Sequence, residues 1–103
     1  MTDKAEWRTK DVDELLAALL RLENADEAAR FLRDIATLGE IHDLAQRWAV
    51  VRRLDAGQHY AQISRETGAS TATITRIAWW LNHGEGGYPK ALARRAAAGK
   101  ARS

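Results

Sequence analysis

The side chains best suited to chemistry lie around the stretch GASTATITRIAWWLN, residues 68–82, where hydroxyl groups recur among small apolar residues. Hydroxyls can hydrogen-bond to nucleic-acid base edges or phosphates, and methyl groups of threonine or alanine can meet the methyl group of thymine. No Asp or Glu occurs from residue 67 to residue 84, as a surface facing a phosphate backbone requires. An ordinary solvated helix surface would look similar, so the surrounding elements must decide between the two.

Other kinds of chemistry find little support. The chain has no cysteine, and its three histidines (His42, His59 and His83) share no metal-ligand spacing. The possible acid–base residues, such as His42, Asp43, His59 and Glu66, form no recognisable constellation, and no phosphate-binding loop is present. We therefore expect neither a metal, nor a cofactor, nor an enzymatic activity.

The composition is that of one small domain with an uneven charge distribution. The chain has 103 residues and a net charge of +2. No apolar run approaches the ~20 residues of a membrane span, and the N-terminus MTDKAEWR lacks a signal-peptide core, so we expect a cytoplasmic location without membrane contact. After Glu85 only basic charges occur. This basic end indicates a polyanion partner, although a solubilising tail is the plain alternative.

Apolar residues at three- and four-residue steps predict an all-α chain. Asn24 or Asp26 can cap a second helix, which Gly39 interrupts after Leu38, and Gly57 ends the third helix. That third helix places Ile41, Leu44, Ala45, Trp48, Val51 and Leu54 on one face. The predicted helices are 11–23, 24–38, 40–56, 60–67, 70–82 and a weak one at 88–98. We expect a flexible N-terminus at 1–10, a folded domain at 11–88 and a basic tail at 89–103.

The stretch from residue 70 could also be a strand, because residues 71–77 alternate polar and apolar side chains. A strand, however, would bury Arg76 in a core. On a helix capped by Ser70, the apolar residues form one stripe at i, i+3, i+4 and i+7: Ile74, Ile77, Ala78 and Leu81. The helix is therefore the better interpretation.

Residues 60–82 match a helix-turn-helix pattern. Ile63 faces inward, small Ser64 lies where two helices touch, Gly68 makes the turn, and Ile74 and Ile77 anchor the second helix. This pattern predicts DNA binding, with the second helix entering the major groove.

The helix-turn-helix prediction assigns roles to individual residues. Side chains near the start of the second helix would reach base edges: Ser70, Thr71, Ala72 and Thr75. Residues around them would contact phosphates: Tyr60, Arg65, Thr73, Arg76, Arg52 and Arg53.

The run QRWAVVRRLDAGQHYAQISRETGASTATITRIAWWLNHGEGGY resembles the Trp repressor superfamily, and more closely its YerC/YecD-type branch. The resemblance spans about residues 12–88, and ETGASTATITR is its most specific part. It implies a bacterial, all-α domain of about six helices that forms an intertwined homodimer and binds operator double-stranded DNA. The helices before residue 57 would make much of the dimer interface.

The same resemblance implies an effector pocket, which this chain would keep only as a vestige. Arg47, Arg76 and Thr37 match residues that hold L-tryptophan in Trp repressor. A glycine of that pocket is replaced by Ile77, and a nearby serine by Trp80. Because an isoleucine side chain obstructs the space that an indole needs, we expect L-tryptophan not to bind and the pocket to be plugged. Pairing of the two arginines with Asp43 or with phosphate is the alternative.

Two interpretations of function remain. The first is a sequence-specific, DNA-binding transcriptional regulator that acts as a repressor. The second is a helical protein-interaction module that has kept the fold without specific DNA binding. Trp48 and Trp79 are interpreted as packing residues, and a stacking platform for single-stranded nucleic acid is a minor alternative.

Overall fold

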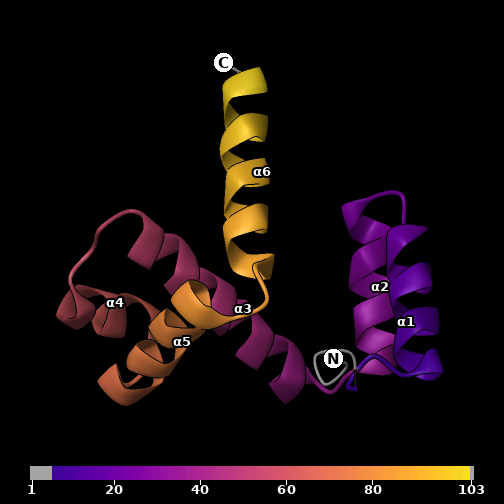
Figure 1. Ribbon diagram of the computed structural model, residues 1–103, viewed down its shortest axis with the longest axis horizontal. Coiled ribbons are helices and arrows are strands. Elements are labelled where there is room, and N and C mark those ends of the chain that lie inside the picture. The colour runs from indigo at the N-terminus through magenta and orange to yellow at the C-terminus, as the bar shows by residue number, and fades with distance from the viewer. Residues whose placement is uncertain (1–5, 103) are drawn as a thin grey trace. The chain divides into compact units, whose positions relative to one another are not determined.

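The fold is all-α, as predicted. A computed structural model describes residues 6–102, and every regular element among them is a helix (Figure 1). The helices are α1 (Lys10–Leu20), α2 (Ala25–Ile35), α3 (Leu38–Asp55), α4 (Tyr60–Thr67), α5 (Thr71–His83) and α6 (Gly87–Arg102). Residues 1–5, half of the predicted flexible N-terminus, lie outside the described part. None of the helices within residues 6–102 is long and apolar enough to cross a membrane.

The chain divides into two compact units, and the boundary along the sequence falls between Ile41 and His42, within α3. In the first unit, the Thr9 hydroxyl caps α1 by accepting the N–H of Val12 at 3.2 Å. The Asn24 side chain caps α2 by accepting the N–H of Glu27 at 2.9 Å, so Asn24 rather than Asp26 begins this helix. Neither α1 nor α2, both described in full, contains a buried residue.

The boundary between α2 and α3 differs from the prediction. α2 ends at Ile35 and Ala36 is extended, so Leu38 and Gly39 belong to the first turn of α3. The Thr37 hydroxyl accepts the N–H of Glu40 at 3.1 Å, and the Glu40 carboxylate accepts the N–H of Thr37 at 2.8 Å. This reciprocal capping box starts the helix before the glycine. The prediction that Gly39 interrupts the helices was therefore wrong.

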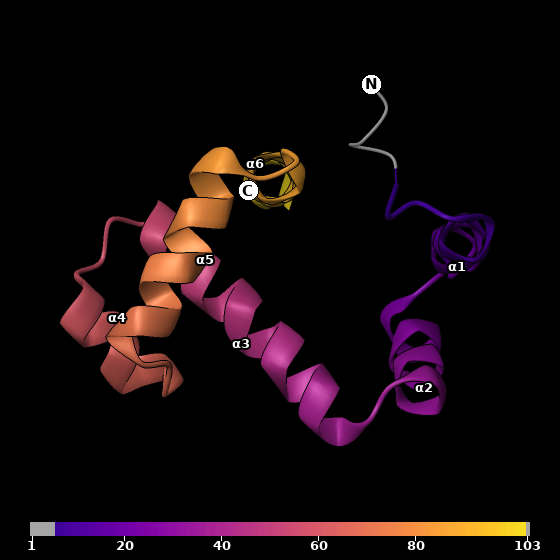
Figure 2. The same cartoon turned by 60° about the horizontal axis from the view of Figure 1, so that its bottom comes forward.

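The second unit contains a small closed core. It is formed by residues of α3, α4, the following turn and α5, with exposed fractions of 6% or less: Val50, Val51, Ile63, Ala69, Ile74 and Ile77. Both views show α4 and α5 packed side by side (Figures 1 and 2). The predicted stripe on α5 is confirmed, since Ala78 and Leu81 are half-buried beside the two isoleucines. On α3 the predicted face is confirmed at Val51, Trp48 and Leu54, which are buried in or packed against the core. Val50 is fully buried in addition, whereas Leu44 is 52% exposed.

The last helix is longer than the predicted 88–98 and includes the basic residues after Glu85. Its first part joins the core, because Tyr88 and Leu92 pack against it. The Tyr88 ring stacks on Trp48, with 6.5 Å between ring centroids, which confirms Trp48 as a packing residue. From Ala93 to Lys100 the side chains are exposed.

Candidate nucleic-acid interface

The segment from α4 to α5 is a helix-turn-helix whose turn depends on glycine. Gly68 has φ +78°, a left-handed conformation that side chains disfavour, and its N–H bonds to the Ser64 carbonyl at 2.9 Å. Ala69 follows with 3% of its surface exposed, and Ser70 then caps α5. The connection from α4 to α5 therefore consists of a left-handed glycine, a buried alanine and a capping serine.

Helix α3 contacts this turn through a hydrogen bond that the sequence did not predict. The Gln46 amide donates to the Thr67 carbonyl at 3.0 Å. The Thr67 hydroxyl donates to the Ile63 carbonyl at 2.7 Å and accepts the N–H of Ala69 at 3.2 Å. The bonds to the Thr67 carbonyl and to the Ala69 N–H satisfy backbone groups at the end of α4 that have no partner within the helix. The position of α5 is thus tied to α3 as well as to α4.

An ion pair also joins α3 to α4. The Arg53 guanidinium donates to the Glu66 carboxylate at 2.9 Å and to the Ala49 carbonyl at 3.2 Å, and Gln62 donates to Glu66 at 3.0 Å. The hydrogen bond from Arg53, followed by that from Gln62, lowers the pKa of Glu66. Arg53, predicted as a phosphate contact, therefore has a structural role as well.

The predicted base-edge residues lie together at the start of α5, with Ser70, Thr71, Ala72 and Thr75 all exposed. The Ser70 hydroxyl accepts the N–H of Thr73 at 3.1 Å, as the predicted cap requires. Their surface carries no carboxylate, because α5 has no acidic residue. Contacts of these residues with bases stay a prediction.

The predicted phosphate contacts are more widely spread. Tyr60 and Arg65 are exposed on α4, and Arg65 forms no hydrogen bond or ion pair with any described residue. Arg52 is half-buried on α3, and its Nε is a buried nitrogen without a hydrogen-bond partner in the described part of the chain. Arg76 donates to the Thr73 hydroxyl at 3.3 Å. Arg65, the one cation of the fully described α4, is thus accessible to a polyanion.

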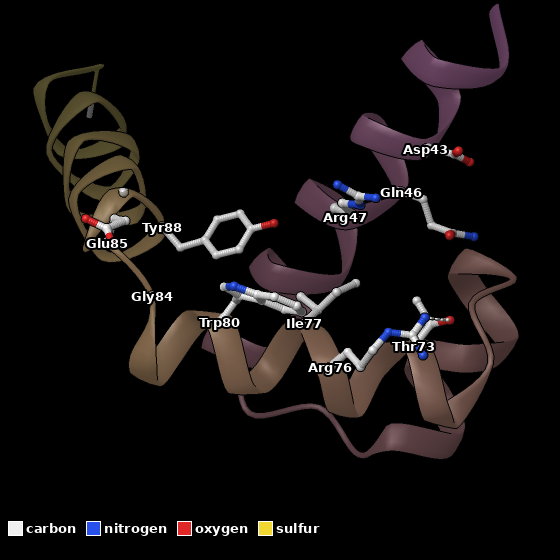
Figure 3. Close-up of a pocket in the computed structure, with 11 residues that line it drawn as sticks. Asp43, Gln46, Arg47, Thr73, Arg76, Ile77, Trp80, Gly84, Glu85 and Tyr88 are labelled. Atoms are coloured by element: carbon white, nitrogen blue, oxygen red, sulfur yellow. Dashed lines mark hydrogen bonds between the residues drawn. The ribbon is translucent and has the colours of Figure 1, made fainter. Parts of the chain in front are cut away.

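A surface pocket of about 760 Å³ lies between α3, α5 and the start of α6 (Figure 3). Arg47 enters it from α3, and Trp80 lies beside Ile77 along α5. Four of the five residues assigned to the effector pocket therefore meet. The fifth, Thr37, is not among the lining residues, and its hydroxyl is used in the capping box of α3.

The cations of this pocket are not neutralised by its acids. Asp43 and Glu85 line the pocket, yet neither Arg47 nor Arg76 forms an ion pair within residues 6–102. The alternative pairing of the arginines with Asp43 is thus not observed. Ile77 is 6% exposed and belongs to the core, whereas Trp80 is 54% exposed. Exclusion of L-tryptophan stays a prediction.

Trp79 faces away from the core, with 54% of its surface exposed. Its ring meets that of Trp80 edge-on at 5.7 Å between centroids and stacks on His83 at 4.8 Å. These three rings form an exposed aromatic group at the end of α5.

The Trp repressor protein family model matches residues 10–96, from the start of α1 into α6. The chain belongs to the Trp repressor family. It is 46% identical over 87 residues to the uncharacterized protein YerC of Bacillus subtilis (strain 168), which covers 84% of each chain and supports the YerC type.

Crystal structures of the Trp repressor family agree with this assignment. A TrpR-like protein from Eubacterium eligens ATCC 27750 superposes with a TM-score of 0.85 and 39% identity, covering 92% of this chain and 96% of the other. A Staphylococcus aureus protein gives a TM-score of 0.86 and 38% identity, covering 93% and 96%. The Trp repressor family is one of regulatory proteins rather than enzymes, which points to a helix-turn-helix regulator.

Proposed function

We propose that the protein is a dimeric transcriptional repressor of the bacterial cytoplasm. It binds double-stranded DNA in a sequence-specific manner. The observation that carries this proposal is the start of α5: three exposed side chains (Thr71, Ala72 and Thr75) on an acid-free helix that Gly68 and Ser70 set after α4. A recognition helix contacts base edges through exposed side chains near its N-terminus.

Affinity would come from phosphate contacts around that helix. Arg65 and Tyr60 on α4 are exposed, and Thr73 and Arg76 lie on α5. Arg52 and Arg53 add positive charge from α3. Because each neutralised phosphate releases counterions, we expect binding to weaken steeply with salt.

Dimer formation is supported by the first unit. Neither α1 nor α2, both described in full, contains a buried residue, and three leucines of α1 are exposed: Leu15 by 36%, Leu19 by 38% and Leu20 by 87%. Exposed apolar side chains on neighbouring turns indicate an interface with another protein. A twofold dimer would present two copies of α5 to successive major grooves, about 34 Å apart. The intertwined arrangement implied by the family would cover these leucines.

Regulation by L-tryptophan is not part of the proposal. Ile77 supplies a side chain within the pocket, and its burial in the core leaves it little room to move aside. We expect isothermal titration with L-tryptophan to show no binding at micromolar concentrations. Micromolar binding at a defined stoichiometry would contradict this expectation.

The test of the proposal compares two arginines of different position. Arg65→Ala should weaken binding to every DNA duplex by a similar factor and reduce the salt slope by about 1, since it removes one phosphate contact. Arg30→Ala is the matched control, because Arg30 is exposed on α2 and, among residues 6–102, pairs only with Asp26. Equal binding by the wild type to all sequences would instead favour the protein-interaction module.

A further inference from the structure

The hydroxyl groups at the start of α5 are not equally available to a ligand. The Ser70 hydroxyl donates to the Thr73 hydroxyl at 3.0 Å and accepts its N–H at 3.1 Å. The Thr73 hydroxyl also accepts from Arg76 at 3.3 Å. The Ser70 hydroxyl is therefore occupied in the cap, and both acceptor positions of the Thr73 hydroxyl are taken, which leaves Thr73 only its own O–H. Reading a base through Ser70 would break bonds that hold the helix start.

Thr75 has used its donor as well. Its hydroxyl donates to the Thr71 carbonyl at 2.9 Å, one turn earlier on the same helix. The residue is nevertheless exposed. With the proton directed at its own backbone, Thr75 offers a ligand its methyl group and its two acceptor lone pairs, but no donor.

Thr71 differs from the other hydroxyl residues. Among residues 6–102, its side-chain hydroxyl has no hydrogen-bond partner, and the residue is exposed. It therefore keeps both its donor and its acceptors for a base edge. Its position four residues before Thr75 places both on the same side of the helix.

Ala72 completes the surface. It is exposed and lies three residues before Thr75, so the two methyl groups are neighbours on the helix. An apolar pair beside one free hydroxyl suits a thymine, whose C5 methyl group projects into the major groove next to its O4 acceptor.

We propose that Thr75 recognises thymine through its methyl group, with Ala72 beside it, and that Thr71 makes the hydrogen bond of the recognition helix to a base edge. This division between the two threonines rests on the proposed DNA binding and specifies how the same helix reads its site. Recognition by the Thr75 oxygen is the competing possibility.

The experiment uses the full-length protein and the duplex with the highest affinity selected from a random-sequence library. Each thymine of that duplex is replaced in turn by uracil, which removes only the C5 methyl group. Binding is measured for the wild type and for Thr75→Val, Thr75→Ser, Thr71→Val and Thr71→Ser. Thermal unfolding of each variant checks that it is folded.

The expected results distinguish base recognition through a threonine methyl group from recognition through a threonine hydroxyl. At one thymine per half-site, uracil should weaken the wild type and Thr75→Val about fourfold, the effect of one buried methyl group. Thr75→Ser should be about fourfold weaker on the original duplex and insensitive to that uracil. Thr71→Val should lose about tenfold, whereas Thr71→Ser should bind nearly as the wild type.

The opposite pattern would overturn the assignment. If Thr75→Ser binds normally and Thr75→Val does not, the Thr75 oxygen reads the base. Uracil without effect at every position would also refute the methyl contact. A wild type that selects no duplex at all would remove the proposed function itself, and the inference with it.

Discussion

The two units of the chain use apolar residues in opposite ways. The second unit closes a core within one chain, with Ile63, Ile74, Val50 and Val51 fully buried. The first unit is rich in leucine, yet α1 and α2, both fully described, bury none of it. The second unit therefore forms its core from its own residues, whereas the first unit presents an apolar surface that we assign to a partner copy of the chain.

The largest expected effect comes from the closed core. Ile63→Ala should lower the free energy of unfolding by about 2–5 kcal/mol, because it leaves a cavity between α3, α4 and α5. Urea unfolding followed by circular dichroism measures this change. A loss well under 1 kcal/mol would mean that the second unit is not closed as described.

The exposed leucines should respond differently. Leu20→Lys should weaken dimerisation about tenfold or more, since burying a leucine contributes about 1.5–3 kcal/mol, while the second unit stays folded. Sedimentation at several concentrations measures the dimer. Glu14→Lys, on the same helix, controls for the added lysine and should have little effect. Unchanged dimerisation in Leu20→Lys would remove this residue from the interface.

The turn between α4 and α5 offers a comparison of two glycines. Gly68→Ala and Gly57→Ala should each cost about 1 kcal/mol of stability, because both residues have positive φ (78° and 81°). Only Gly68→Ala should also weaken DNA binding, as Gly57 lies outside the turn. Gel shifts and thermal unfolding on the same samples separate the effects. Equal loss of binding by both variants would argue against a special role of the turn.

The smallest effect concerns the Arg53–Glu66 pair. Because the pKa of Glu66 is lowered in the folded state, the pair stabilises the protein above the ordinary glutamate pKa of about 4.5. This contribution is lost as the pH falls further, through the lowered folded pKa. Glu66→Gln should therefore slightly lower the melting temperature at pH 7 but not at strongly acidic pH. A difference from the wild type that is the same at both pH values would contradict the pairing.

Local signals explain what could be predicted. Gly68 and Ser70 act within a few residues, so the turn, the cap and the stripe Ile74, Ile77 on α5 followed from the sequence. The start of α3 was also local, since Thr37 and Glu40 form a capping box. Gly39 lies between these two residues, and a glycine, which is unfavourable inside a helix, obscures the signal.

Contacts between distant residues could not be predicted from spacing. Gln46 reaches the carbonyl of Thr67, 21 residues away, and Arg53 reaches Glu66, 13 residues away. Nothing in the pattern of either segment selects its partner, because the crossing of α3 and α4 brings them together. The grouping of Arg47 with Ile77 and Trp80 was predicted from family resemblance, and the structure places all three around one pocket.

The central claim is that a dimer of this chain reads a DNA sequence through α5. The most direct measurement is selection from a random duplex library, followed by titration of the selected and a scrambled duplex at physiological salt. We predict a site with two related halves about 10 base pairs apart, bound by two chains at least about 10³-fold more tightly than the scrambled duplex. No enrichment, or equal affinity for both duplexes, would contradict the claim.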